Sequence, residues 1–87
     1  MLEEINEPID VIAKFKQGNL IPVKFLWHLR EYHIQKVNLS YSSFEGRTKF
    51  YYFAVSDGAN YFKLEFNTEN LQWTLLEADI EQKMSVN

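Results

Sequence analysis

The feature that most constrains the fold of this chain is a two-residue alternation of apolar and polar side chains, broken by turn residues roughly every ten positions. Successive side chains of a strand point to opposite faces of a sheet, so this pattern is typical of strands with one buried face. The alternation runs through residues 9–16, 23–27, 30–34, 59–66 and 71–76, and residues 47–56 add a sixth expected strand because they are rich in aromatic and β-branched side chains. About six short strands are therefore expected.

The segments between these strands predict how the chain turns. Asp57-Gly58 is the strongest hairpin signal, because a type I′ turn needs positive φ at both central residues. His28-Leu29 fits a second tight turn, and residues 40–46 are expected to form a loop. The alternation changes phase between Ile34 and Val37, which indicates a bulge or bend. We therefore expect an all-β fold, a strongly bent antiparallel meander forming a small open barrel of SH3-like architecture.

The length of 87 residues corresponds to one domain. We expect an acidic N-terminal tail over residues 1–8, a single β-domain over 9–77 and a polar C-terminal tail over 78–87. A short C-terminal helix from about Ala78 is an alternative for the last segment. Residues 11–76 hold eight Lys and Arg against five Asp and Glu, so a mildly basic body carries acidic ends.

The alternation also predicts which side chains form the core. They are the apolar residues that share one parity within each expected strand. The predicted core consists of Val11, Phe15, Val23, Phe25, Trp27, Tyr32, Ile34, Phe53, Val55, Phe62, Leu64, Trp73 and Leu75.

Several of these positions resemble a small bacterial family of unknown function. Its pattern is similar to Pro22-x-x-Phe25-x-Trp27 followed by Arg30-x-Tyr32-x-Ile34, and to Trp73-x-Leu75 near the end of the chain. Members of that family lie near translesion-polymerase genes in some bacteria, so the resemblance implies a loose nucleic-acid context. In this chain Leu29 stands at the family's turn glycine, and the family's arginine-rich face is thinner. The matching residues are mostly apolar, so the resemblance implies a shared fold more than a shared activity.

The sequence contains no pattern that points to catalysis. There is no cysteine, which excludes disulfides, a thiolate nucleophile and cysteine-based zinc sites. His28 and His33 could approach each other across their turn, but they lack a third well-placed ligand. No glycine-rich phosphate loop or Ser-His-Asp arrangement is present. We expect a non-enzyme with no cofactor and no metal.

The N-terminus and the composition predict where the protein acts. The N-terminus is acidic and has no apolar run, so we expect no signal peptide. No apolar stretch is long enough for a transmembrane helix, so we expect no membrane association. The absence of cysteine favours a reducing compartment, and we therefore expect a soluble cytoplasmic protein.

The outward-facing positions of the strands carry the candidate binding residues. These residues combine lysines with tyrosines, and they are Lys14, Lys24, Tyr52, Tyr61 and Lys63. Such a surface suits a protein interface or self-association, because aromatic residues are enriched at interfaces. It also suits single-stranded nucleic acid, because amines meet phosphates and rings stack on bases. A third alternative is that the sheet folds over and the outward rings form a second small core. We expect a binding module whose partner is a protein or a second copy, with nucleic acid as the alternative.

Overall fold

The computed structural model describes residues 1–80, which form seven β-strands and no helix. The strands are β1 (Glu3–Lys16), β2 (Asn19–Trp27), β3 (Arg30–His33), β4 (Lys36–Glu45), β5 (Thr48–Ser56), β6 (Tyr61–Asn67) and β7 (Gln72–Asp79). The predicted all-β class is confirmed.

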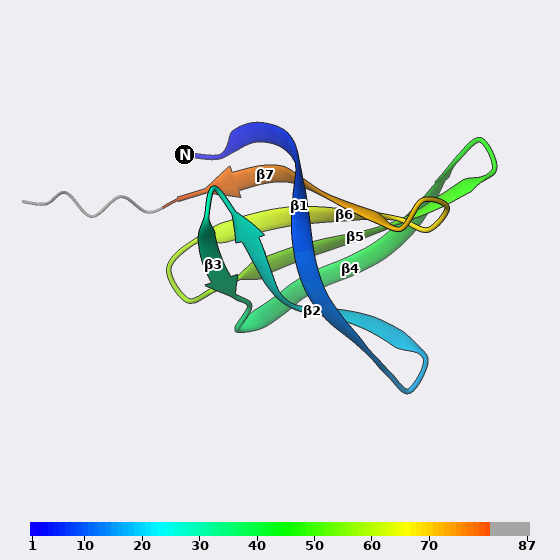
Figure 1. The fold of residues 1–87 in the computed structure, drawn as a ribbon, viewed down its shortest axis with the longest axis horizontal. Helices are drawn as coiled ribbons and strands as arrows, with labels where there is room; N and C mark the ends of the chain where they lie inside the picture. Colours follow the sequence, from blue (N-terminus) through cyan, green and yellow to red (C-terminus); the bar gives the residue numbers. More distant parts are fainter. Residues whose placement is uncertain (81–87) are drawn as a thin grey trace, which may run out of the picture.

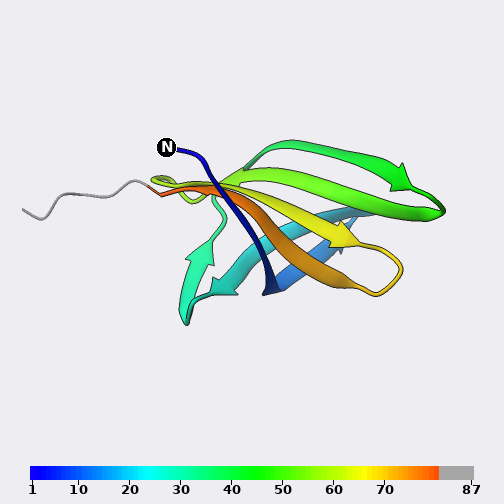
Figure 2. The same cartoon turned by 90° about the horizontal axis from the view of Figure 1, so that it is seen from above.

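All the strands belong to one antiparallel sheet, in the order β3-β2-β1-β7-β6-β5-β4 (Figure 1). The long strand β1 joins the two halves, because Glu3–Ile9 pairs with β7 and Asp10–Lys16 pairs with β2. The view from above shows the sheet curling so that β1 and β2 lie across from β4 and β5 (Figure 2). The predicted small, open and strongly bent barrel is therefore confirmed.

The link between β3 and β4 connects the two edges of the sheet. The Ile34 N–H donates to the carbonyl oxygen of Val23, and the Gln35 N–H donates to that of Ser56, both at 2.9 Å. The bend predicted between Ile34 and Val37 lies at this crossing. No ladder forms between β3 and β4, so the barrel stays open along this seam.

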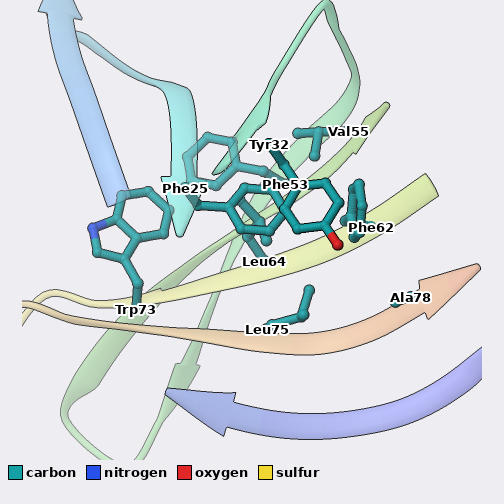
Figure 3. Packing of buried hydrophobic residues seen from close by; sticks show 9 residues of the cluster. All are labelled: Phe25, Tyr32, Phe53, Val55, Phe62, Leu64, Trp73, Leu75 and Ala78. Carbon is teal, nitrogen blue, oxygen red and sulfur yellow. The ribbon is translucent and has the colours of Figure 1, made fainter. Parts of the chain in front are cut away.

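The core lies on the concave face of the sheet, and its side chains point toward one another from five strands (Figure 3). The rings of Phe25 and Phe62 meet edge to face with centroids 4.9 Å apart, and Tyr32 stacks on Phe25 at 5.2 Å. Both arrangements are favourable for aromatic pairs. The predicted core residues that are buried are Phe25, Tyr32, Phe53, Val55, Phe62, Leu64, Trp73 and Leu75. Val11, Trp27 and Ile34 are partly buried against them.

Two predicted core residues, Val23 and Phe15, are exposed instead. The register between β1 and β2 shifts so that Ile12 faces Lys24 and Ala13 faces Pro22, which leaves Val23 as the extra residue of a β-bulge. The bulge reverses the parity of β2, and Pro22 is buried in its place. Phe15 keeps the predicted parity, but it lies near the tip of the β1–β2 hairpin beyond the core and is 77% exposed.

Two predicted boundaries and one predicted turn also differ from the structure. The segment expected as an acidic tail contributes Glu3–Pro8 to β1. The loop expected over residues 40–46 is strand β4 as far as Glu45, because its serines and aromatics pair along the whole of β5. The Asp57-Gly58 turn is a four-residue loop, in which the Asp57 carboxylate accepts hydrogen bonds from the N–H groups of Ala59 and Asn60. Only Gly58 has positive φ there.

The predicted C-terminal tail over residues 78–87 differs at its start. Ala78 and Asp79 belong to β7 and not to a helix. The part of the tail over residues 81–87 lies outside the described residues.

Candidate binding face

The convex face of β4, β5 and β6 carries a row of aligned polar and aromatic side chains. Tyr41 of β4 lies opposite Tyr52 of β5, which lies opposite Glu65 of β6. Two residues further along β5, Ala54 lies opposite Lys63 of β6. Residues of the other parity on β5 and β6 fill the core, so this row faces away from it.

Three rings of this row pack against one another. The rings of Tyr41 and Tyr52 stack with centroids 5.0 Å apart and planes 22° apart. Phe50 extends the stack beyond Tyr52, at 6.3 Å. The Lys63 Nζ lies 5.7 Å from the ring centroid of Tyr41 and 5.8 Å from that of Tyr52. These distances fit a cation held over two aromatic faces, which fixes the lysine stem above the rings. We call Tyr41, Phe50, Tyr52 and Lys63 the aromatic face.

The surroundings of the aromatic face favour the protonated form of Lys63 and the neutral form of Tyr52. Burial raises the pKa of Tyr52, and the carboxylates of Glu65 and Glu45 raise it further. A hydrogen bond with Tyr41 raises the pKa of Lys63, and the Glu77 carboxylate acts in the same direction. The rings and their single lysine therefore lie among carboxylates.

The structure brings together only some of the five predicted binding residues. Tyr52 and Lys63 belong to the aromatic face, and Tyr61 lies two residues before Lys63 on the same side of β6. Tyr61 lines an open hollow at the end of the sheet, together with Ser56, the loop residues 58–60 and Asp79.

The two other predicted residues, Lys14 and Lys24, lie in the opposite half of the sheet. Lys14 of β1 faces Ile21 of β2. The Lys24 Nζ is paired with a Glu31 carboxylate oxygen at 3.2 Å. The strands β6 and β7 separate β5 from β1 in the sheet order, so these lysines do not extend the aromatic face.

Sequence reasoning missed Tyr41, which it placed in a loop. The signal was present as the alternation of Leu39, Tyr41 and Ser43, which all face the convex side. The serines between the apolar residues of this segment are typical of turns, and they concealed the strand.

The two histidines each meet one carboxylate and do not meet each other. His28 Nε2 lies 3.0 Å from Glu7 Oε1, and His33 Nε2 lies 3.3 Å from Glu31 Oε1. The Trp27 indole N–H donates to the same Glu7 oxygen at 2.9 Å, and this bond, assisted by His28, lowers the pKa of Glu7. Within residues 1–80 no group of three or more His, Asp or Glu side chains is placed to hold a metal ion.

A second open surface lies in the seam between the β1–β2 hairpin and the β4–β5 pair. This groove of about 390 Å³ is lined by Phe15, Leu20 and Pro22 on one side and by Val37, Tyr51 and Phe53 on the other. Ser40, Tyr41 and Ser42 of β4 also line the groove, so its walls combine apolar and polar side chains. The groove exposes part of the core edge along β4.

Comparison of the chain with protein-family models, with curated proteins and with solved structures gave no match. The resemblance to the small bacterial family therefore stays a prediction. In the described part of the chain no helix is long and apolar enough to cross a membrane.

Proposed function

We propose that this protein is a non-catalytic binding module that docks on another protein through the aromatic face. The observation that carries the proposal is the stack of Tyr41 and Tyr52 beneath Lys63, held on the solvent side of a regular sheet. Tyrosines supply large contact areas with few rotatable bonds, so they lose little conformational entropy on binding. The chain's lack of cysteine supports action in the cytoplasm.

The charges around the rings indicate the chemistry of the partner. Glu45, Glu65 and Glu77 lie around the aromatic face and leave Lys63 as its single cation. A partner segment with an apolar or aromatic residue at its centre and Lys or Arg at its sides would stack on the rings and pair with the carboxylates. An extended peptide or a flat protein surface would fit this arrangement.

Single-stranded nucleic acid is the alternative partner, and the cation above two rings is the observation that favours it. Stacking of bases on tyrosine with a neighbouring amine is the usual mode of such binding. The carboxylates around the rings oppose it, because they repel phosphates. Lys14 and Lys24, which would add positive charge, lie on the other half of the sheet. We therefore place the protein partner first.

The two alternatives can be tested with the same variants. Selection from a displayed library of random peptides should enrich segments that combine aromatic with basic residues, and Tyr52→Ala should abolish their binding. Lys24→Ala, on the other half of the sheet, is the matched control and should leave binding unchanged. Failure to enrich any Tyr52-dependent peptide would contradict the proposal.

The nucleic-acid alternative is tested by a separate binding measurement. Fluorescence anisotropy with labelled single-stranded DNA and RNA would be followed at low and moderate salt. Binding that falls steeply with salt, and that both Tyr52→Ala and Lys63→Ala abolish, would assign the aromatic face to nucleic acid. We expect no binding in this measurement.

A further inference from the structure

Strand β4 forms a long unpaired edge of the sheet, and its residues Ser40, Tyr41 and Ser42 line the groove that separates it from the β1–β2 hairpin. Among the described strands only β5 has Cα atoms within 8 Å of β4. The opposite edge, β3, has four residues, of which Arg30, Glu31 and His33 are polar, and both features disfavour further pairing. Strand β4 has ten residues, no proline, and charges only at its ends, Lys36 and Glu45. Such an edge is a template for another strand.

The hairpin geometry fixes which backbone groups of β4 point outward. Glu45 and Thr48 flank the two-residue turn to β5, so the backbone groups of Glu45 point toward β5. Because these groups alternate along an antiparallel pair, those of Phe44, Ser42 and Ser40 point away from β5. The register shift between Val37 and Leu39 leaves Asn38 as a bulge. Beyond it, the outward groups belong to Val37.

We propose that two copies of this chain pair antiparallel along β4, about a two-fold axis at Tyr41. In this register Ser40 of each copy lies opposite Ser42 of the other, and both offer their outward N–H and C=O groups. A two-fold axis perpendicular to a continuous sheet keeps convex residues opposite convex ones, and Tyr41 then faces its own equivalent on the convex side.

The ends of the strand make this register complementary in side chains as well. Once the bulge is passed, Val37 lies opposite Phe44 on the concave face, and Lys36 lies opposite Glu45 on the convex face. The first pair buries two exposed apolar residues, and the second joins opposite charges at each end of the shared ladder. Without the bulge, Val37 would lie opposite Glu45.

The neighbouring register fits less well. With the axis at Ser42, Leu39 would lie opposite the Glu45 carboxylate, and Lys36 would have no partner strand opposite it. The proposed register therefore pairs the opposite charges of β4 and also pairs its exposed apolar residues. It also places the two aromatic faces side by side, because Tyr41 belongs to both the edge and the aromatic face.

Cysteine cross-linking tests the position of the axis, because the natural chain has no cysteine. Directly opposed residues whose backbone groups point away from each other have Cα atoms about 4.5 Å apart, within the range that a disulfide spans. Tyr41→Cys should therefore form a disulfide-linked dimer under mild oxidation, whereas Ser43→Cys, which faces Leu39, should not. Faster cross-linking of Ser42→Cys than of Tyr41→Cys would overturn the proposal.

Charge reversal tests the end pairs in solution by sedimentation velocity on the full chain. Glu45→Lys or Lys36→Glu alone places like charges opposite each other twice per dimer, and each should raise the dissociation constant roughly tenfold. The double variant, Lys36→Glu with Glu45→Lys, should restore the dimer. An unmodified chain that stays monomeric at high micromolar concentration would overturn the proposal.

A proline variant separates loss of pairing from loss of fold. Ser42→Pro removes an N–H that no strand of the same chain accepts, so the monomer should keep its thermal stability while the dimer disappears. Ser42→Ala keeps the N–H and should still dimerise. Dimerisation of Ser42→Pro equal to that of the natural chain would exclude β4 as the interface. These results are independent of peptide binding at Tyr52, so the self-pairing and the proposed function can fail separately.

Discussion

Leu29 is almost fully exposed in a backbone conformation that its side chain disfavours. It follows His28 in the turn between β2 and β3, and both residues have positive φ, 52° and 63°. A non-glycine residue in this left-handed region costs roughly 1–2 kcal/mol, and Leu29, 97% exposed, gains no burial that could offset it. The turn predicted from the sequence is therefore present, but strained.

Leu29→Gly should raise the free energy of unfolding by about 1 kcal/mol, because glycine adopts positive φ without a steric penalty. Urea denaturation followed by tryptophan fluorescence would measure the change. Leu29→Ala is the control, since it removes the exposed side chain but keeps the Cβ atom. An equal gain from the alanine variant would show that the strain does not arise from the backbone.

The stabilising contribution of Asp57 in the β5–β6 loop depends on pH. Burial alone would raise the pKa of Asp57, but the hydrogen bonds from Asn60 and Ala59 outweigh it and lower the pKa below its ordinary value. A carboxyl whose pKa is lowered on folding stabilises the protein above its unfolded pKa of about 3.8–3.9. That contribution is lost as the pH falls through the folded pKa.

Asp57→Ala should therefore lower the free energy of unfolding by about 1–2 kcal/mol at pH 7, since several hydrogen bonds to one carboxylate are removed. The difference from the natural chain should shrink as the pH falls below about 4. Thermal denaturation from pH 2 to pH 7 would follow it. Asp57→Asn keeps one acceptor oxygen, so it should lose less stability at pH 7. A constant difference over this range would contradict the assignment.

At the scale of elements, the β1–β2 hairpin extends beyond the core that its strands help to build. Phe15 and Phe53 both face the concave side, but Phe53 is 3% exposed and Phe15 lies at the rim of the seam groove. Phe53→Ala should therefore cost about 3–5 kcal/mol of stability, whereas Phe15→Ala should change it by less than about 0.5 kcal/mol. Urea denaturation of the two variants provides the comparison, and equal losses would contradict the exposed position of Phe15.

The element pattern also explains how far the sequence could predict the structure. Alternation identified the strands that contribute Phe25 and Leu64, because apolar and polar residues alternate where one face of a strand is buried. Aromatic and β-branched content identified the strand that contributes Phe53. The bulge at Val23 depends on the register with β1, which local alternation does not contain. Tyr41 was missed for a related reason: an edge strand has exposed residues throughout, so its pattern resembles a loop.

The residues of the candidate site could also be predicted only in part from the sequence. Parity placed Tyr52, Lys63, Lys14 and Lys24 on outward faces. The curl of the sheet turns those outward faces in different directions, and it leaves only Tyr52 and Lys63 in contact. Curvature arises from bulges and from the crossing of β1 between the two halves, which a strand-by-strand reading does not include.

At the scale of the whole molecule, the first residues of the chain complete the sheet. Glu3–Ile9 pairs with β7, and Ile5 packs against the core. Deletion of residues 1–8 should therefore lower the free energy of unfolding by at least about 3 kcal/mol, through the lost burial of Ile5 and the lost ladder bonds. Circular dichroism and urea denaturation would measure this loss.

A double variant, Glu3→Ala with Glu4→Ala, provides the control for charge. It removes two carboxylates of the same segment but keeps the backbone that pairs with β7. We expect its stability to stay within about 0.5 kcal/mol of that of the natural chain. A deletion that behaved like this control would mean that the segment is a tail and not a strand.

The pairing of β1 with β7 also sets an order of events during synthesis. The strands β1, β2 and β3 can pair as soon as they emerge, and so can β4, β5 and β6, because each connection within these groups is short. The half of β1 made first has to wait for β7, which is synthesised after the other six strands, before it can pair with its neighbour. Until then the nascent chain presents two partial sheets with open flanks, the stage at which a growing β protein is most exposed to wrong partners.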